Sequence, residues 1–345
     1  MTVLVVGAGL AGATAARVLS DKGHQVIVKE ARDHIAGNCF DSNATGTMIH
    51  KYGPHIFHTN SESVWNFLSQ FTEWHQYYHR VTAQIHGQFV PIPFNFTTID
   101  MLFPKCEAEQ LKSTLIAEVG FGNATNIHDL MASKNSELKE LGEFVYDTVF
   151  KGYTIKQWGP YASDLTKSVL ARVPINCSYD DRYFKDKYQG IPLNGYTEMV
   201  KNMLCQPSIS ITTEEKVNTA EIFDNQFDHV VYTGAIDELF DYCYGKLPYR
   251  SLEFKINDYD KQQYPTVQTN FPNDYAFTRC TDMALFPSNI SSHKSVLYFE
   301  YPQNWEEHKN ERYYPVPAPS AKKLYNQYKE KLTQFPKLIL CGRLA

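Results

Sequence analysis

The sequence has little that would suit a secreted, membrane-bound or zinc-binding protein. Its seven cysteines are scattered along 345 residues without any Cys-x-x-Cys pair, so neither a disulfide framework nor a metal site is indicated. The first apolar run stops at Gly7 and has no basic leader, and it is too short for a signal peptide or a membrane span. We therefore expect a cytoplasmic protein without membrane insertion.

An excess of charge of one sign is also missing. The 33 basic and 38 acidic residues give a formal net charge of -5, which creates no field that would draw the chain to nucleic acid or to anionic lipid. No nucleic-acid partner is expected, and any anionic ligand must be held by a few local cations. Hydrophobic residues make up 43% of the chain, enough at this length for two or three domains.

What the sequence does contain begins with a glycine-rich turn. Residues 3–6 predict a strand, residues 13–19 a helix and residues 25–30 a second strand, which is the size of a parallel strand-helix-strand unit. Between the first strand and the helix lies Gly7-Ala8-Gly9-Leu10-Ala11-Gly12, a G-x-G-x-x-G match in the context that makes it meaningful.

Each glycine of this turn has a physical task. Gly7 permits the tight turn, Gly9 lets the backbone approach a pyrophosphate, and Gly12 lets the helix pack closely on the strand. The turn, including Leu10, opens the helix, whose N-terminus offers free N–H groups to phosphates, and Glu30 can accept both hydroxyls of an adenosine ribose. The alternative is a glycine-rich turn without a ligand.

The choice between NAD and FAD depends on the residues that follow. Small and apolar residues continue at Ala16, Leu19, Gly23, Val26 and Val28 up to the acid, an extended spacing that resembles flavoproteins of the glutathione-reductase and amine-oxidase kind. A second glycine element, His34-Ile35-Ala36-Gly37-Asn38, follows directly, as in those flavoproteins. FAD is therefore favoured, with Gly37 and Asn38 as further contacts.

The rest of the chain divides into helical and strand-like stretches. Helical spacing occurs at residues 64–71 after a cap at Thr59-Asn60, and at 108–115, 138–149, 196–203 and 324–332; strand-like runs occur at 209–211, 227–232, 252–301 and 338–340. The predicted class is α/β. Its parts are a discontinuous Rossmann-like FAD-binding domain (1–80, 192–236, 320–345), a helical insertion (98–170) and an antiparallel sheet domain (81–97, 171–191, 237–319).

Four further segments carry a more specific resemblance. They are His50 to Asn60 (HKYGPHIFHTN), Lys151 to Gly159 (KGYTIKQWG), Tyr188 to Pro192 (YQGIP) with Gly195 to Thr197 (GYT), and Tyr313 to Val316 (YYPV). With the N-terminus they resemble the UDP-galactopyranose mutase family across nearly the whole chain. The closing Gly342-Arg343-Leu344-Ala345 is similar to the start of that family's final flavin-binding motif.

The resemblance implies an isomerase that interconverts UDP-galactopyranose and UDP-galactofuranose for cell-surface polysaccharide synthesis. In that family reduced FAD acts as a covalent catalyst through its N5 atom, without net redox change. The protein then holds the leaving diphosphate, places the sugar over N5 and excludes water. The implied partner is a nucleotide sugar, and a homodimer is implied by the family alone.

The same resemblance assigns residues. Arg172 and Arg279 match the family's two diphosphate arginines, which suit phosphate because the guanidinium is planar and always charged. The implied substrate contacts are Tyr153, Trp158, Tyr183, Asn270 and Tyr314. His55 and His58 match a pair that reaches the flavin, the second near N5, and Gly342 and Arg343 match cofactor contacts.

Several alternatives stay open. From spacing alone, each arginine would be a surface or ion-pairing residue, the aromatic residues would be structural, and His55 would be a packed histidine; a metal site at the two histidines lacks a third ligand. His79 or Arg80 stands where many members have an asparagine, and Asn176 where some have a second arginine, so UDP-N-acetylgalactosamine or a dTDP-6-deoxyhexose is an alternative substrate.

The C-terminus leads to a further expectation. In the family, a tyrosine, an acidic residue and a helix facing the flavin follow the segment that closes this sequence, so we expect weaker flavin binding here. This leaves a truncated, non-catalytic nucleotide-sugar binder as one rival function. The dinucleotide motif by itself leaves an FAD-dependent oxidoreductase as another.

Overall fold

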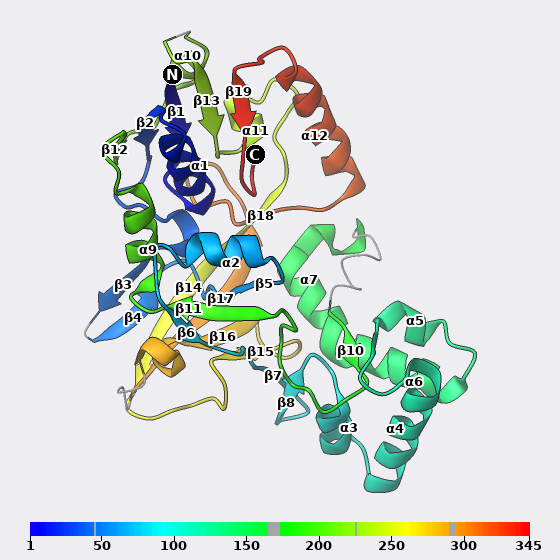
Figure 1. The fold of residues 1–345 in the computed structure, drawn as a ribbon. Helices are drawn as coiled ribbons and strands as arrows, with labels where there is room; N and C mark the ends of the chain where they lie inside the picture. Colours follow the sequence, from blue (N-terminus) through cyan, green and yellow to red (C-terminus); the bar gives the residue numbers. More distant parts are fainter. Residues whose placement is uncertain (45, 165–172, 225, 290–293) are drawn as a thin grey trace. The chain divides into compact units, whose positions relative to one another are not determined.

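The protein is described by a computed structural model that covers residues 1–345 except 45, 165–172, 225 and 290–293 (Figure 1). The chain forms two compact units. Unit 1 comprises Met1–Gln76, Gly190–Tyr249 and Arg312–Ala345, and unit 2 comprises Tyr77–Gln189 and Arg250–Glu311. The three-domain division expected from the sequence stays a prediction.

Unit 1 is built on a parallel sheet. Its strands follow the order β12 (Ile209–Thr212), β2 (Gln25–Lys29), β1 (Thr2–Val6), β13 (His229–Tyr232) and β19 (Leu338–Leu340). The central strand β1 has Val3, Leu4 and Val5 at most 1% exposed, because sheet neighbours and covering helices enclose it. This confirms the Rossmann-like part of the predicted fold and explains why β1 is an uninterrupted apolar run.

Helices and short strands complete unit 1. Helix α1 (Leu10–Asp21) packs on the sheet through small residues, and α9 (Gly195–Leu204) lies against α1 (Figure 1). The other elements are the 3-10 turn η1 (Gly37–Cys39), β3 (Asp41–Ala44), β4 (Thr47–His50), β5 (Phe57–Thr59), α2 (Glu62–Leu68), β6 (Trp74–Gln76), the end of β11 (Tyr188–Pro192), α10 (Thr219–Phe223), α11 (Ile236–Leu239), β18 (Tyr314–Pro315) and α12 (Pro319–Leu332).

Unit 2 contains a larger mixed sheet. Its strands follow the order β14 (Tyr249–Tyr259), β17 (Ser295–Asn304), β16 (Arg279–Asp282), β15 (Gln268–Asn270), β7 (Val81–Ile85) and β8 (Gln88–Ile92). All neighbours are antiparallel except β15 and β7, which run parallel. The predicted antiparallel sheet is therefore antiparallel-rich and mixed. The parallel pair joins segments that are distant in the chain, so no tight hairpin turn imposes antiparallel pairing on them.

The helical part of unit 2 forms its own core. It comprises α3 (Phe96–Leu102), α4 (Lys105–Val119), α5 (Ile127–Met131), α6 (Ser136–Val145), a π-helical turn (Tyr146–Lys151), α7 (Gly152–Trp158) and the 3-10 turn η3 (Gly159–Asp164), with the short strands β9 (Ala124–Thr125) and β10 (Ile175–Asn176) paired nearby. Phe96, Ile99, Leu115, Ile127 and Leu138 are each at most 2% exposed and belong to one cluster. The predicted helical insertion thus has an apolar centre.

Deleting part of this core has a measurable cost. Leu138 is fully buried, so Leu138→Ala is expected to lower the free energy of unfolding by about 3 kcal/mol through lost burial and a residual cavity. Urea unfolding followed by circular dichroism measures the change. Ile116→Ala is the control, because Ile116 is 41% exposed; equal losses for both variants would contradict the proposed core.

Two local expectations need correction. The N-cap of α2 is Ser61, whose hydroxyl accepts a hydrogen bond from the Val64 N–H, and not Thr59-Asn60, which end and follow β5. The apolar stripe at 138–149 is not one α-helix, because the backbone widens into a π-helical turn after Val145. In the described part of the chain, no helix is long and apolar enough to cross a membrane.

Candidate functional site

The glycine-rich turn of unit 1 has the close backbone contacts that its motif predicts. Gly7 adopts a positive φ of 101°, and a Cβ on Gly12 would lie 1.9 Å from the Gly7 carbonyl oxygen. Gly9 precedes Leu10, the first residue of α1, and a Cβ there would approach nothing nearer than the Gly37 Cα at 3.7 Å. Gly9 therefore leaves its own surface open, as a turn that admits a phosphate requires.

Glu30 lies directly after β2 and is buried at 7% exposure. Its carboxylate accepts hydrogen bonds from the Ala8 N–H at 2.7 Å and the Arg32 N–H at 2.9 Å. These bonds fix the acid beside the glycine-rich turn. A carboxylate at the end of the second strand can take the ribose hydroxyls of a dinucleotide.

The second glycine element lies against the first. Gly9 and Ala36 form a parallel β-bridge, and the Ala36 N–H donates to the Ala8 carbonyl at 2.9 Å. Gly37 has a φ of 56°, and a Cβ on it would come within 3.0 Å of the Gly9 Cα. The structure thus brings together the two segments that the sequence assigned to one cofactor.

Asn38 is held by an arginine that the sequence analysis did not single out. The Arg32 Nη1 donates to the Asn38 Oδ1 at 3.0 Å, and the guanidinium carbon lies 4.5 Å from the centre of the Tyr52 ring. The Tyr52 hydroxyl in turn lies 2.7 Å from the His34 Nε2. This cluster orders the loop after β2 around the turn.

The closing residues of the chain reach the same sheet end. Gly342 has a φ of 119°, and a Cβ on it would lie 3.5 Å from the Ala11 Cβ and 3.6 Å from the Thr233 carbonyl oxygen. The guanidinium carbon of Arg343 lies 5.4 Å from the Tyr314 ring centre. Gly342 therefore lies beside the glycine-rich turn, and Arg343 contacts Tyr314, one of the predicted substrate residues. Together these open glycine surfaces and the fixed acid fit an adenine dinucleotide.

The histidines of the HKYGPHIFHTN segment occupy different environments. The His55 Nδ1 donates to the Gly53 carbonyl at 2.9 Å, and its backbone N–H donates to the His50 Nδ1 at 3.2 Å. Both rings lie edge-on to Tyr196. His58 lies on β5 and is exposed. His55 is therefore packed and hydrogen-bonded, and the flavin contacts of both His55 and His58 stay predictions.

Burial of His50 has a consequence for stability against pH. Burial lowers the pKa of His50 from 6.5 to about 4, so the folded protein keeps this ring neutral. As the pH falls below 6.5, the unfolded chain takes up a proton that the folded chain refuses. Stability is then lost until about pH 4, by up to about 3 kcal/mol.

The measurement is urea unfolding at pH 7, 5.5 and 4.5 for the wild type and for His50→Asn, which keeps an acceptor. The variant is expected to lose less stability on acidification, and parallel curves would contradict the prediction.

In unit 2, strands β15 and β16 bring two predicted substrate residues together. Asn270 and Arg279 are directly paired across these strands. The Arg279 Nε donates to the Glu300 Oε2 at 2.6 Å, and Glu300 is fully buried on the neighbouring strand β17. Burial raises the pKa of Glu300, and the charge of Arg279 opposes this rise. The pairing fixes the guanidinium beside Asn270.

The other predicted substrate residues are spread over several elements. Tyr153 and Trp158 are half-buried on α7, and Tyr183 packs against His79 and Phe184 with ring centres 5.8 and 5.0 Å apart. Tyr314 belongs to unit 1. Arg172 lies outside the described residues. The assignment of these side chains to a substrate stays a prediction.

The positions at which the sequence is expected to differ from many family members have structural partners. His79 is 2% exposed, and its Nδ1 lies 3.1 Å from the Tyr77 hydroxyl. Arg80 is instead half-exposed and pairs with Asp181 at 2.9 Å. Asn176 is fully buried, and its Nδ2 donates to the Asp180 carbonyl. Of His79 and Arg80, His79 is therefore the residue that packs in the interior, next to Tyr183.

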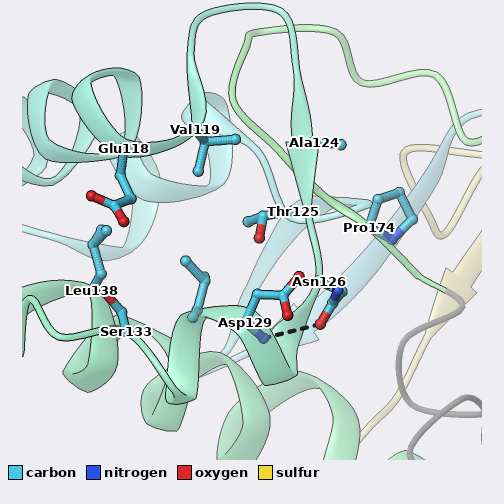
Figure 2. A pocket seen from close by; sticks show the side chains of 10 residues that line it. Glu118, Val119, Ala124, Thr125, Asn126, Asp129, Ser133, Leu138 and Pro174 are labelled. Carbon is cyan, nitrogen blue, oxygen red and sulfur yellow. Dashed lines mark hydrogen bonds between the residues drawn. The ribbon is translucent and has the colours of Figure 1, made fainter.

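A cavity of about 590 Å³ lies in the helical part of unit 2 (Figure 2). Figure 2 shows its lining from the end of α4, from β9 and from α5, including Glu118, Thr125 and Asp129. None of the predicted site residues that the structure describes belongs to its lining. Its two carboxylates make it unsuited to an anionic diphosphate.

Comparison with known proteins settles the family. A model of the UDP-galactopyranose mutase family matches residues 148–345, and a model of the NAD(P)-binding Rossmann-like domain matches residues 5–71. The chain is 34% identical over 361 residues to the UDP-galactopyranose mutase of Mycoplasma genitalium, covering 99% of this chain and 89% of that relative. The chain belongs to the UDP-galactopyranose mutase family. It is accordingly an enzyme of the isomerase class, and the predicted resemblance is confirmed.

Two further likenesses agree with this family. The chain is 36% identical over 351 residues to the dTDP-fucopyranose mutase of Escherichia coli, covering 99% of this chain and 92% of that relative. A crystal structure of reduced UDP-galactopyranose mutase matches with a TM-score of 0.70 at 16% identity, covering 98% of this chain and 89% of that one. The fold is therefore that of the family, including the Rossmann-like dinucleotide-binding domain.

The structure adds side chains to which the sequence analysis gave no role. Glu300 orients Arg279, and Arg32 orients Asn38. Lys156 and Arg250 bind backbone carbonyls around α7. A buried carboxylate or a cation bound to carbonyls has no local sequence signature, although Lys156 lies inside the KGYTIKQWG segment.

Proposed function

We propose that this enzyme interconverts the pyranose and furanose forms of a nucleotide-linked galactose-type sugar with reduced FAD as its cofactor. The observation that carries the proposal is Arg279, fixed by the buried Glu300 and paired with Asn270, in a chain of this family. A guanidinium whose Nε is occupied by a carboxylate keeps one orientation. That is what recognition of a diphosphate requires.

The residues of each unit have separable tasks in this proposal. The glycine-rich turn, Glu30 and the second glycine element hold the FAD, with the backbone at Gly9 open to the pyrophosphate. When bound, reduced FAD supplies a nucleophilic nitrogen for the anomeric carbon of the sugar. Arg279, with Asn270 beside it, stabilises the negative charge on the diphosphate as it leaves, and holds it for the return step.

The aromatic residues serve binding in this proposal. Tyr153, Tyr183 and Tyr314 offer hydroxyl donors to phosphate, and Trp158 offers an apolar face to the nucleotide. His55 has its Nδ1 proton directed to the Gly53 carbonyl, so in its neutral form the ring presents Nε2 as an acceptor. We place His58, on β5, near the flavin. A cytoplasmic location and a homodimer stay predictions.

We propose two candidate sugar nucleotides, in order of preference. UDP-galactopyranose and UDP-galactofuranose form the first substrate pair, since curated UDP-galactopyranose mutases match over 99% of the chain. A dTDP-linked 6-deoxyhexose is the second candidate, since a dTDP-fucopyranose mutase matches at 36% identity over a similar length. The buried His79 next to Tyr183 is a place where this chain departs from many relatives.

A chromatographic assay tests the reaction. The protein is supplied with FAD and dithionite and with UDP-galactofuranose, the side from which product accumulates, and in parallel with dTDP-fucofuranose. Conversion to the pyranose form only under reduction is expected, and the ratio of the two kcat/KM values identifies the sugar. Oxygen consumption with stoichiometric flavin reduction would instead indicate an oxidoreductase. Binding of UDP without conversion of either substrate would indicate a non-catalytic binder.

A further inference from the structure

Lys156 is surrounded by main-chain oxygen atoms. Its Nζ donates to the carbonyls of Asn273 at 3.1 Å, Tyr275 at 2.9 Å and Phe277 at 3.1 Å, and also to the carbonyl of Phe271. These four carbonyls come from alternate residues of the loop that joins β15 to β16. The ammonium has three N–H donors, so four oxygens surround it as they would surround a bound cation.

Burying the ammonium group of Lys156 costs free energy, which other contacts of the group must offset. Lys156 is half-buried on α7, and burial lowers the pKa of its ammonium from 10.5 to about 8, while the charge of Asp274 opposes the decrease. An ammonium withdrawn from water is stabilised only when its donors are used. Here the carbonyl dipoles of one loop replace its water.

The loop and the helix also meet directly. A Cβ on Gly152 would lie 2.3 Å from the Pro272 carbonyl oxygen, so only glycine permits this approach. The Asn273 Nδ2 donates to the Thr148 carbonyl at 3.0 Å, one turn before α7. Within the loop, the Phe271 ring packs edge-on against those of Tyr275 and Phe277 at 5.3 and 4.8 Å. The loop is therefore packed internally and is in direct contact with α7.

A second cation binds the backbone carbonyls at the C-terminal end of this helix. Arg250 is 3% exposed; its Nε donates to the Gln157 carbonyl at 2.8 Å, its Nη2 donates to the Lys156 carbonyl at 3.3 Å, and its Nη1 contacts Asn304. Cations at the C-terminal carbonyls of a helix are favourable because those groups lack helical partners. The chain then turns at Gly159 with a φ of 55°.

We propose that Lys156 is a positioning residue that holds α7, with Tyr153 and Trp158, to the β15–β16 loop and thereby to the strand pair that carries Asn270 and Arg279. This inference rests on the proposed function, because it gives these four side chains one ligand. The lysine itself does not touch the substrate. It fixes the spacing of two groups of contacts that come from segments more than a hundred residues apart.

The test uses Lys156→Met, with Lys139→Met as the matched control because Lys139 is exposed on α6 and pairs only loosely with Glu143. Amide hydrogen exchange of residues 152–159 and 271–278 reports the attachment itself. In Lys156→Met both segments are expected to exchange about tenfold faster, while residues 105–119 of α4 are unchanged. Lys156→Gln, which keeps donors without the charge, gives the same readout with a smaller effect if the methionine variant does not fold.

Titration calorimetry with UDP and steady-state kinetics report the consequence for function. The Kd for UDP and the KM are expected to rise about tenfold in Lys156→Met with kcat changed less than about threefold, because uniform binding is lost. Unchanged exchange would overturn the attachment, and faster exchange with an unchanged UDP Kd would overturn the positioning role. If the wild type neither binds UDP nor converts a sugar nucleotide, the proposed function fails, while the exchange result still decides the attachment.

Discussion

Arg279→Ala is expected to lower kcat/KM for the sugar nucleotide by about 1,000-fold while FAD stays bound. Each hydrogen bond to a charged group contributes about 1.5–3 kcal/mol, and a bidentate arginine-phosphate pair contains two. About 4 kcal/mol corresponds to a factor of about 1,000. Steady-state assay under dithionite measures turnover, and the flavin absorbance of the purified variant measures retained FAD.

The controls for this variant follow from its ion pair. Removing the guanidinium leaves the carboxylate of Glu300, which is fully buried, without its partner, which is strongly destabilising in a protein interior. The double variant Arg279→Ala/Glu300→Gln removes that penalty and is expected to show the same kinetic loss with recovered stability. Arg17→Ala deletes a cation that pairs with Asp21 on α1 and should leave kcat/KM within about twofold of wild type. Full activity in the double variant would refute the diphosphate role.

Gly9→Ala is expected to weaken flavin binding strongly without unfolding the protein. Gly9 has a φ of -70°, which alanine adopts freely, and the new Cβ would meet the Gly37 Cα only at an ordinary contact distance of 3.7 Å. The methyl group would instead occupy the surface from which a pyrophosphate approaches the turn. The Kd for FAD, measured by fluorescence quenching, is expected to rise at least about 100-fold, while the melting temperature of the flavin-free protein changes by less than about 2 °C.

Gly12→Ala provides the contrast within the same motif. Its Cβ would lie 1.9 Å from the Gly7 carbonyl oxygen, so the helix must move away from the strand. This variant should lose both flavin binding and stability. Normal FAD affinity in Gly9→Ala would show that the open surface at this turn does not receive the cofactor.

The order of the elements was predictable wherever a local rule acts alone. The uninterrupted apolar run of β1, the glycine spacing and the helical stripe of α9 each depend on short-range sterics or periodicity, and the structure has them where expected. The cap of α2 was misplaced because Thr59, Asn60 and Ser61 are all cap formers, and only the actual hydrogen bond distinguishes them. The parallel pairing of β15 with β7 joins distant segments, so no short pattern indicates it.

The candidate site was predictable in its glycine-rich part and less so elsewhere. Gly9 and Gly37 belong to two glycine motifs whose residue spacing predicts the backbone geometry of each turn, and the structure brings them together. Arg279, in contrast, looks in the sequence like any arginine, and its fixed orientation comes from Glu300, 21 residues later on an adjacent strand. The surroundings of Lys156 consist of main-chain oxygens, which every residue possesses, so no residue type predicts them. Tertiary contacts give both cations their roles.

The π-helical turn at Tyr146–Lys151 determines the directions, around the helix axis, in which the following side chains of the same helical segment point. A wide turn holds about one residue more than an α-helical turn, and one residue corresponds to about 100° of rotation around the helix axis. Closing this turn by deleting a single residue would rotate Tyr153, Lys156 and Trp158 together to a different face while leaving their identities intact. A related chain with the same KGYTIKQWG segment therefore needs the same number of residues in the preceding turn, so that these side chains point in the same directions.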